Sequence, residues 1–364
     1  MSGRARVVLL GIDGCPAEQL SPSLTPRLWA MGADGGLTLS GRAPLPSSTY
    51  PCFATLLTGC LPSRHEVRAT ARRPGVVPGW AGQPQVAVPT LFDACRAAGL
   101  QSAAVQGDHL LHAVLRTEAA DVTWPPGGVP PPGVPLDAHG YPTNAAVRPH
   151  LLAAARDPAI DFLFGHLNEG DTLGHDLGPD AAAARASYAE ADRIAGELLD
   201  ALRPAWTRTV VIVLSDHGME PRTGRAPIDL LNSPPVRALV ADVLGDGGAA
   251  LVRPRDGVTP RDAGAALADV PGVAGWGGGD PGPIVAEAQR GWIFATPRLP
   301  LRGFHGGPAT ARTFAVVGGG HRAVPALARS MAARPPHLAD WAPTIARLLG
   351  LEMPGADGRS LLEE

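Results

Sequence analysis

The segment Thr209-Val-Val-Ile-Val-Leu214, followed directly by Ser215-Asp216-His217-Gly218-Met219, decides the fold of this chain. Its unbroken run of apolar and mostly β-branched residues is typical of a central parallel strand that helices cover on both faces. Ligands of open α/β sheets bind beyond the carboxyl ends of such strands. Two adjacent titratable side chains at that end would be costly to bury without a partner, so the segment predicts a sheet with a site at its edge.

Strand-length apolar runs alternate with helical segments along the rest of the chain. We expect further strands at 7–11, 102–105, 160–165 and 314–317, and helices near 23–31 and at 90–98, 181–202 and 341–349. This alternation is typical of chains that cross from one parallel strand to the next through a helix. It predicts an α/β fold, with a doubly wound, mostly parallel central sheet and helices on both faces.

Two stretches interrupt this alternation. Residues 124–135 are rich in proline and glycine, which predicts a surface loop. Residues 227–298 carry weaker and shorter elements, and the main sheet resumes only near Thr313. We therefore expect residues 1–226 and 299–364 to form the main α/β domain, with a small inserted α+β lobe, like a cap, at 227–298.

The charge balance excludes some classes of partner. The 364 residues include 34 acidic and 31 basic side chains, and every basic one is arginine because the sequence contains no lysine. A formal net charge of −3 gives no electrostatic footprint for a nucleic-acid polymer or an anionic membrane surface. The hydrophobic fraction of 45% is too high for a disordered chain. We expect a globular protein that binds neither a nucleic-acid polymer nor a membrane.

The sequence also bears on location. No stretch approaches the roughly 18 consecutive apolar residues of a transmembrane helix. The apolar run at 7–11 is too short for the core of a signal peptide, and no small-residue cleavage site follows it. Four cysteines in so long a chain do not make a disulfide framework. These features predict a cytoplasmic protein.

Residues that commonly bind metals follow the expected strands at four places. In chain order, the candidates are Asp13, Asp171, His175, Asp216, His217 and His305. Carboxylates and imidazoles together suit Zn²⁺, with Mn²⁺ or Fe²⁺ as substitutes. Taken singly, an aspartate here could be a helix cap, and Asp171 with His175 could be an i,i+4 ion pair. Their recurrence at four places in one α/β chain favours a metal site.

Longer motifs carry a resemblance over nearly the whole chain. They are Gly11-Ile-Asp-Gly14, Pro46-Ser-Ser-Thr-Tyr-Pro-Cys-Phe-Ala-Thr-Leu-Leu-Thr-Gly59 with the following Pro62-Ser-Arg-His65, Asp171-x-x-Gly-His175-x-x-Gly-Pro179, Ser215-Asp-His-Gly-Met219, and Ala342-Pro-Thr-Ile-Ala346 with the tail to Leu361. In this order they resemble the alkaline phosphatase superfamily, and within it the type I phosphodiesterase/nucleotide pyrophosphatase family. The resemblance implies that the main domain is the catalytic domain of a hydrolase.

The resemblance implies two divalent metal ions and a threonine nucleophile. Asp171, His175 and His305 would hold one ion, and Asp13, Asp216, His217 and the Thr49 oxygen would hold the other. Two cations about 4 Å apart suit in-line displacement at a phosphoryl centre. Thr49 would attack and form a phosphothreonine that water then hydrolyses, because coordination activates a threonine hydroxyl. Ser48 competes for this role, but the family's Thr-aromatic-Pro pattern favours Thr49; helix capping is the non-catalytic alternative for the pair.

Departures from related patterns narrow the substrate. A sulfatase of the superfamily needs Cys or Ser in place of Thr49 and an arginine four residues later, so sulfatase activity is not expected. The absence of lysine argues against a close identity with phosphonoacetate hydrolases. The family's phosphate-binding asparagine falls at Thr70, where either Thr70 or a nearby arginine (Arg68, Arg72 or Arg73) would supply the donor. An arginine fork would suit the dianionic phosphate of a monoester.

The remaining histidines divide between structural and substrate roles. His139 and Tyr141, which follow the proline-rich loop, are candidates for lining the substrate pocket, against the default of an ordinary surface histidine. We expect His65 to be structural. The favoured function is hydrolysis of phosphodiester or pyrophosphate bonds in a small, nucleotide-like phosphorylated substrate. The alternatives are a phosphomonoesterase or phosphonate hydrolase of the same superfamily and, from another class, a non-catalytic protein that binds a phosphorylated ligand.

Overall fold

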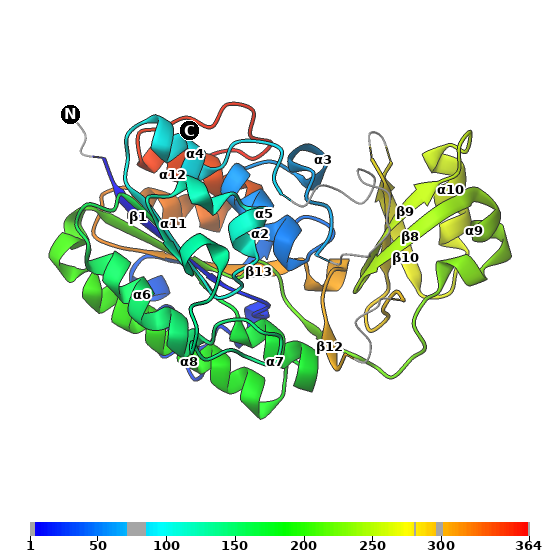
Figure 1. The fold of residues 1–364 in the computed structure, drawn as a ribbon, viewed down its shortest axis with the longest axis horizontal. Coiled ribbons are helices and arrows are strands. Elements are labelled where there is room, and N and C mark those ends of the chain that lie inside the picture. Colours follow the sequence, from blue (N-terminus) through cyan, green and yellow to red (C-terminus); the bar gives the residue numbers. More distant parts are fainter. Residues whose placement is uncertain (1–3, 71–84, 280–281, 296–300, 363–364) are drawn as a thin grey trace.

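A seven-stranded sheet forms the centre of the computed structural model, which describes residues 4–70, 85–279, 282–295 and 301–362 (Figure 1). The strand order is β2-β13-β6-β1-β5-β3-β4. These strands are β1 (Arg6–Ile12), β2 (Gly36–Arg42), β3 (Ser102–Gln106), β4 (Val122–Trp124), β5 (Phe162–Leu167), β6 (Thr209–Leu214) and β13 (Arg312–Gly318). Only β13 runs antiparallel to its neighbours, β2 and β6, among these described strands. The predicted mostly parallel sheet is therefore confirmed.

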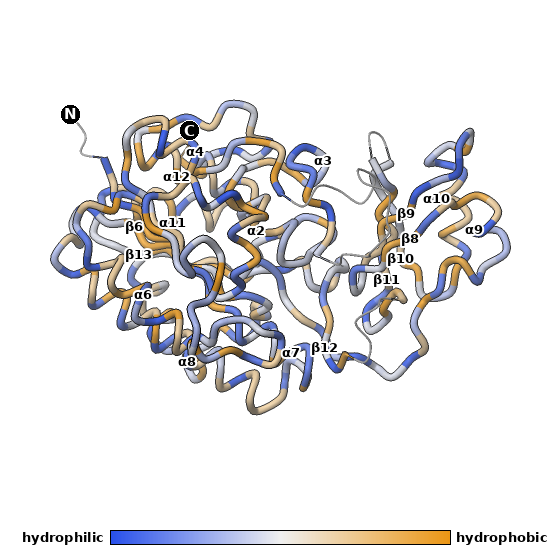
Figure 2. Tube along the Cα trace, in the orientation of Figure 1, coloured by the Kyte–Doolittle hydropathy of each residue, from blue (hydrophilic) through white to orange (hydrophobic). Residues whose placement is uncertain are grey.

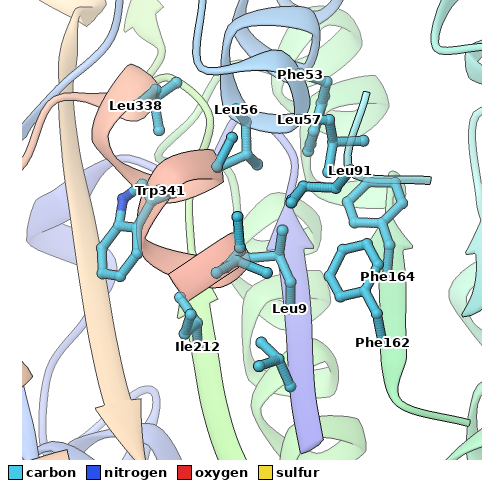
Figure 3. Close-up of a cluster of buried hydrophobic side chains, with 14 of the residues drawn as sticks. Leu9, Phe53, Leu56, Leu57, Leu91, Phe162, Phe164, Ile212, Leu338 and Trp341 are labelled. Atoms are coloured by element: carbon cyan, nitrogen blue, oxygen red, sulfur yellow. The ribbon is translucent and has the colours of Figure 1, made fainter. Parts of the chain in front are cut away.

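The strand β1 lies inside the sheet, paired in parallel with β5 and β6, and every one of its residues is buried. Successive side chains of a strand point to opposite faces, so Leu9 enters one apolar layer and Leu10 the other. Figure 3 shows Leu9 in the first layer, among side chains that include Phe53 and Ile212. A strand buried on both faces needs apolar residues without alternation, which is the pattern of its sequence.

Helices cover both faces of the sheet. The first apolar layer includes residues of α2 (Thr49–Thr58), α4 (Leu91–Ala97), α5 (Leu111–Val114), α11 (Val324–Ala333) and α12 (Trp341–Leu348). The second includes residues of α1 (Pro26–Asp34), α6 (Asn144–Arg156) and α8 (Ala182–Ala201). Figure 2 shows that apolar residues concentrate on the strands, whereas α6 and α8 alternate between apolar and polar residues. The doubly wound arrangement is thus present.

A second, separate sheet lies beside the main domain (Figure 1). Its order is β10-β11-β9-β8, from β8 (Val240–Asp246), β9 (Ala249–Pro254), β10 (Val273–Gly278) and β11 (Ile284–Ala288). The helices α9 (Pro234–Leu239) and α10 (Pro260–Ala268) pack on the side away from the main domain, around an apolar cluster of their own. The exact boundaries of the lobe stay predictions, and the second, at residue 298, falls within residues 296–300, outside the described part.

Two short strands join the lobe to the main domain. β7 (Glu220–Pro221) precedes the lobe and β12 (Gly303–Phe304) follows it, and the two pair antiparallel. One sequence expectation was wrong at its edge: the surface loop does not begin at Trp124, which ends β4 and is buried with its ring stacked on His150 at 4.4 Å. No helix within the described residues is long and apolar enough to span a membrane.

Candidate metal centre

Asp171, His175 and His305 form a first group of potential metal ligands. Asp171 and His175 lie one turn apart on α7 (Glu169–Leu177), which follows β5, and His305 follows β12. His175 Nε2 lies 3.1 Å from His305 Nε2 and 3.4 Å from Asp171 Oδ2, and His305 Nε2 lies 3.7 Å from Asp171 Oδ1. Atoms at this spacing can share one metal ion.

Asp13, Asp216 and His217 form a second group. Asp13 follows β1, and Asp216 and His217 follow β6, so two adjacent parallel strands deliver all three side chains to one edge. His217 Nε2 lies 3.2 Å from Asp216 Oδ2 and 3.4 Å from Asp13 Oδ1, and all three residues are fully buried. The rings of His217 and His305 stack with centroids 4.0 Å apart. The two groups therefore adjoin, as a binuclear site requires.

Thr49 lies beside the second group, at the first residue of α2. Its Oγ1 is 3.3 Å from His217 Nε2, so one ion could contact both. The hydroxyl of Ser48 is engaged elsewhere, because Ser48 Oγ donates to Asp246 Oδ2 at 2.7 Å. A helix N-terminus also provides a favourable field for an anion. Of the two neighbouring hydroxyls, only that of Thr49 is in contact with a candidate ligand among the described residues.

The carboxylates of both groups suit bound cations. Asp13 Oδ1, Asp171 Oδ1 and Asp216 Oδ2 are buried and accept no hydrogen bond within the part of the chain that the structure describes. Burial raises the pKa of Asp13 well above its usual value, and the nearby Asp216 and Asp171 add to this rise. Burial is also the main cause that raises the pKa of Asp216 to about 6. Buried carboxylates need positive charge to stay ionised, and divalent cations at the two groups would provide it.

Backbone carbonyls orient two of the imidazoles. His175 Nδ1 lies 3.0 Å from the Gly303 carbonyl oxygen, and His217 Nδ1 lies 2.9 Å from the Gly218 carbonyl oxygen. A carbonyl only accepts, so each Nδ1 carries the proton and donates it. Each Nε2 then presents its lone pair to the carboxylates of its own group. This is the tautomer that metal-binding histidines need, fixed by a hydrogen bond of the other ring nitrogen.

His166, on β5, holds the carboxylate of Asp13, a role that the sequence did not indicate. The Asp108 backbone N–H donates to His166 Nδ1 at 3.2 Å, so the ring proton is on Nε2. His166 Nε2 then donates to Asp13 Oδ2 at 2.9 Å, which leaves the other oxygen of Asp13, Oδ1, to bind a metal ion. Burial and the nearby His217 lower the pKa of His166 to about 3, so its ring is neutral. The partners are 153 residues apart in sequence, and no local spacing connects them.

The residues proposed to bind phosphate lie in different places. Thr70 is buried beside the start of α2, where its Oγ1 accepts from the Tyr50 backbone N–H at 3.0 Å. Arg68 instead lines a cavity of about 420 Å³ between the main domain and the lobe, together with Leu251 and Val285. The other two arginine candidates, at 72 and 73, fall outside the described residues. Thr70 is thus the described candidate that lies beside the start of α2, where Thr49 is located.

His139 and Tyr141 lie near the first ligand group, on a loop fixed by Asp137. The backbone N–H groups of His139 and Tyr141 both donate to Asp137 Oδ1 at 2.9 Å, and Asp137 Oδ2 accepts from the α7 residue Thr172 at 2.7 Å. The His139 ring stacks near that of His175, with centroids 6.3 Å apart. The loop therefore brings His139 close to a candidate metal ligand, and Tyr141 lies next to His139, with ring centroids 6.4 Å apart.

His65 has the structural role that the sequence predicted. It is fully buried, its Nδ1 accepts from the Val67 backbone N–H at 3.1 Å, and its Nε2 lies 3.0 Å from Thr55 Oγ1 on α2. Burial, with a smaller effect from Arg68, lowers its pKa to about 3. A neutral His65 therefore connects α2 to the chain that leads to Thr70.

Known proteins share the fold and part of the sequence. The chain superposes on murine ectonucleotide pyrophosphatase/phosphodiesterase 5 with a TM-score of 0.70, at 18% identity and with 97% of both chains covered. It is 28% identical to venom phosphodiesterase 2 of Crotalus adamanteus over an alignment 244 residues long, which covers 59% of this chain and 27% of the venom protein. It is 33% identical to GPI ethanolamine phosphate transferase 3 of Schizosaccharomyces pombe over 84 residues, 23% of this chain and 9% of that protein. This chain thus matches about a quarter of the venom enzyme's length.

The family model for type I phosphodiesterase/nucleotide pyrophosphatase matches residues 7–274, which is more than half of the chain. The matched region begins with β1, which precedes Asp13, and includes Thr49 and the ligands up to His217. His305 lies beyond it, yet it meets Asp171 and His175 in space. This chain therefore belongs to the type I phosphodiesterase/nucleotide pyrophosphatase family of the alkaline phosphatase superfamily.

Proposed function

We propose that this protein is a metal-dependent hydrolase that cleaves phosphodiester or pyrophosphate bonds of a small, nucleotide-like substrate through a phosphothreonine at Thr49. The observation that carries the proposal is the contact of Thr49 Oγ1 with His217 Nε2, at 3.3 Å, beside two adjoining groups of buried Asp and His ligands. Family membership supports hydrolysis of this bond class. The donor set of three carboxylates and three imidazoles favours two Zn²⁺ ions, with Mn²⁺ or Fe²⁺ as substitutes.

The reaction divides between attack and release. Divalent cations at the two groups would neutralise charge on the phosphoryl oxygens and lower the pKa of the Thr49 hydroxyl. Thr49 Oγ1 gives up its proton to solvent and forms the new bond to phosphorus as the bond to the leaving oxygen breaks, and the leaving oxygen takes up a proton from water. The phosphothreonine formed from a diester keeps the second ester group of the substrate. Water then attacks the same phosphorus and releases Thr49. The field of the α2 N-terminus favours the anionic phosphate during both steps.

Substrate contacts would come from Thr70 on one side and from the Asp137 loop on the other. The Thr70 hydroxyl accepts from Tyr50, so its own proton can be donated to a phosphate oxygen. His139, whose ring is near that of His175, and the neighbouring Tyr141 offer ring surfaces for an aromatic or sugar group. An inactive threonine-to-alanine variant of murine ectonucleotide pyrophosphatase/phosphodiesterase 5 was solved in complex with AMP, which supports a nucleotide-like substrate.

Rates on three substrate classes test the choice of bond. We expect an aryl phosphodiester to be hydrolysed faster than an aryl phosphomonoester or an aryl phosphonate, each compared by kcat/KM with one zinc-loaded preparation. Thr70, which carries no charge and contacts the Tyr50 backbone next to Thr49, would be the phosphate donor, and an uncharged donor suits the single negative charge of a diester. A monoester preference of about 100-fold, equivalent to about 2.7 kcal/mol, would reverse the assignment in favour of a phosphomonoesterase.

The substitution Thr49→Ala tests the nucleophile. We expect it to lower kcat by about 1,000-fold or more while the zinc content, measured by mass spectrometry, changes little, because three of the four second-group ligands remain. Acid quenching during turnover of a phosphodiester should trap the phosphoryl group, with its remaining ester group, on wild-type protein only. Ser40→Ala, at an exposed hydroxyl of β2, is the matched control and should leave turnover unchanged. Full activity of Thr49→Ala would refute the covalent route.

A further inference from the structure

The inserted lobe reaches the candidate metal centre through the tight turn Gly247-Gly248, which joins Asp246, the last residue of β8, to the start of β9. The Gly248 backbone N–H donates to the carbonyl oxygen of the metal-ligand candidate His305 at 2.7 Å. A Cβ on Gly247 would lie 1.9 Å from that same carbonyl oxygen, and a Cβ on Gly306 would lie 2.0 Å from the Asp246 carbonyl oxygen. Only glycine permits so close an approach at these two positions. The turn is thus packed directly against the backbone of the site.

The side chain of Asp246 makes a second connection, to the nucleophile segment. Its Oδ2 accepts from Ser48 Oγ at 2.7 Å and from the Thr70 backbone N–H at 3.0 Å. Ser48 precedes the nucleophile Thr49 directly. Asp246 is only 6% exposed and Ser48 is fully buried, so water competes little for these hydrogen bonds. Hydrogen bonds to an ionised carboxylate are also stronger than neutral ones.

These contacts fix Thr70 from two sides. Asp246 holds its backbone N–H, and the Tyr50 backbone N–H on α2 holds its hydroxyl oxygen at 3.0 Å. A threonine hydroxyl has one proton to donate besides the lone pairs that accept. With the oxygen and the backbone both held, that proton has a restricted set of directions at the start of α2, beside Thr49. A donor aimed in advance costs no reorganisation when charge develops on the phosphoryl oxygens.

We propose that Asp246 of the inserted lobe is a positioning residue of the phosphate pocket, which fixes Thr70 so that its hydroxyl donates to a non-bridging phosphate oxygen. This inference rests on the proposed function, because it assumes that phosphate binds beside Thr49. It makes the lobe a part of the catalytic site: the main domain supplies the donor, and the lobe sets its position. Asp246 acts through Thr70 and Ser48 and has no contact with the reacting atoms in this assignment.

A double-mutant cycle on the zinc-loaded protein tests the coupling. Asp246→Asn keeps the shape of the side chain but removes its charge, and an amide oxygen accepts hydrogen bonds from the Ser48 hydroxyl and the Thr70 backbone N–H more weakly than a carboxylate oxygen does. Thr70→Val removes the hydroxyl while it keeps the backbone N–H. We expect each substitution alone to lower kcat/KM for an aryl phosphodiester by about 10-fold or more, mainly through kcat. In the Thr70→Val background, Asp246→Asn should cause less than about a threefold further loss, because its effect passes through the missing hydroxyl.

Zinc content and the unfolding midpoint are measured for every variant. Asp256→Asn, at an exposed acid of the same lobe, is the matched control and should behave as wild type. Independent multiplication of the two losses would overturn the proposal, and so would a loss that tracks lowered zinc content or stability. If Asp246→Asn does not fold, Ser48→Ala removes one of the two hydrogen bonds to Asp246 and enters the same cycle, with a smaller loss expected.

Binding of inorganic phosphate, measured by calorimetry, separates this inference from the proposed function. We expect Asp246→Asn to weaken phosphate binding about 5-fold or more in the presence of the Thr70 hydroxyl and to have no effect in the Thr70→Val background. If wild-type protein hydrolyses no ester but shows this pattern, the proposed function fails and the positioning role stands. If turnover is normal in wild type but Asp246→Asn changes neither turnover nor phosphate binding, the positioning role fails alone.

Discussion

Replacing His166 by phenylalanine tests whether the metal centre depends on residues behind the ligands. His166 joins two buried groups, because it accepts from the Asp108 backbone N–H and donates to Asp13 Oδ2. Phenylalanine keeps the ring and its edge-on contact with Phe53, at 4.7 Å between centroids, so no large cavity forms. Both buried polar groups lose their partner, and each such loss costs about 1–3 kcal/mol. The free energy of unfolding of the metal-free protein should fall by about 2–6 kcal/mol.

The effect on metal binding is separate and adds to this loss. Asp13 loses the hydrogen bond that orients its carboxylate, and removing such a partner typically lowers metal affinity about 10- to 100-fold. By linkage, the zinc-loaded protein should lose about 1.4–2.7 kcal/mol more stability than the metal-free protein. Urea unfolding of both forms and a zinc competition assay give the two quantities. His150→Phe, at an exposed histidine of α6, is the control substitution. A zinc affinity within twofold of wild type would refute the orienting role of His166.

Three further predictions concern stability. The pKa of His65 is about 3 in the folded protein and near 6.5 in the unfolded chain, so the free energy of unfolding falls as the pH drops through this window. Between pH 7 and pH 5 in urea titrations, His65→Gln should lose about 2 kcal/mol less of this free energy than wild type does. An equal loss in both proteins would contradict the neutral buried state of His65. Leu9→Ala, at a fully buried position of β1, should lower the free energy of unfolding by about 2–5 kcal/mol, whereas a loss below about 1 kcal/mol would mean that this layer is not tightly packed. Chelation should lower the thermal unfolding midpoint, because the buried Asp13 and Asp216 lose their counter-charge, and an unchanged midpoint in the chelator would argue against bound metal.

The central strands could be predicted because burial on both faces leaves only apolar residues. β1 and β6 are continuous apolar runs in the sequence and are fully buried in the sheet. The ligand residues follow these strands directly, and parallel strands end at the same edge, so the expectation that they meet needed no long-range information. The antiparallel direction of β13 could not be predicted from the sequence, because a buried strand has the same kind of residues whether it runs parallel or antiparallel.

The edge strands and the contacts between residues far apart in the chain could not be predicted from the sequence. β2 is half-buried and interrupted by glycine, and β4 has three residues, so neither has the apolar run that identified the central strands. His166 and Asp246 are single polar residues whose partners lie 153 and 198 positions away. No spacing rule connects such residues, because the fold alone determines that they meet. The metal identity and the cytoplasmic location stay predictions on the same sequence grounds as before.

The position of the lobe in the chain explains how it can shape the site. It is inserted after the ligands that follow β6 and before His305, and the strands β7 and β12 on either side of it pair with each other. Because the chain leaves the main domain and returns to it at adjacent points, the main sheet can form without strain whatever segment is inserted there. The same geometry makes His305 the first ligand after the lobe, and its carbonyl oxygen receives the lobe's Gly248 N–H. Because the turn at Gly248 contacts His305 and, through Asp246, Thr70, we expect a movement of the lobe to shift both residues, which would couple the proposed metal ligand to the proposed phosphate donor.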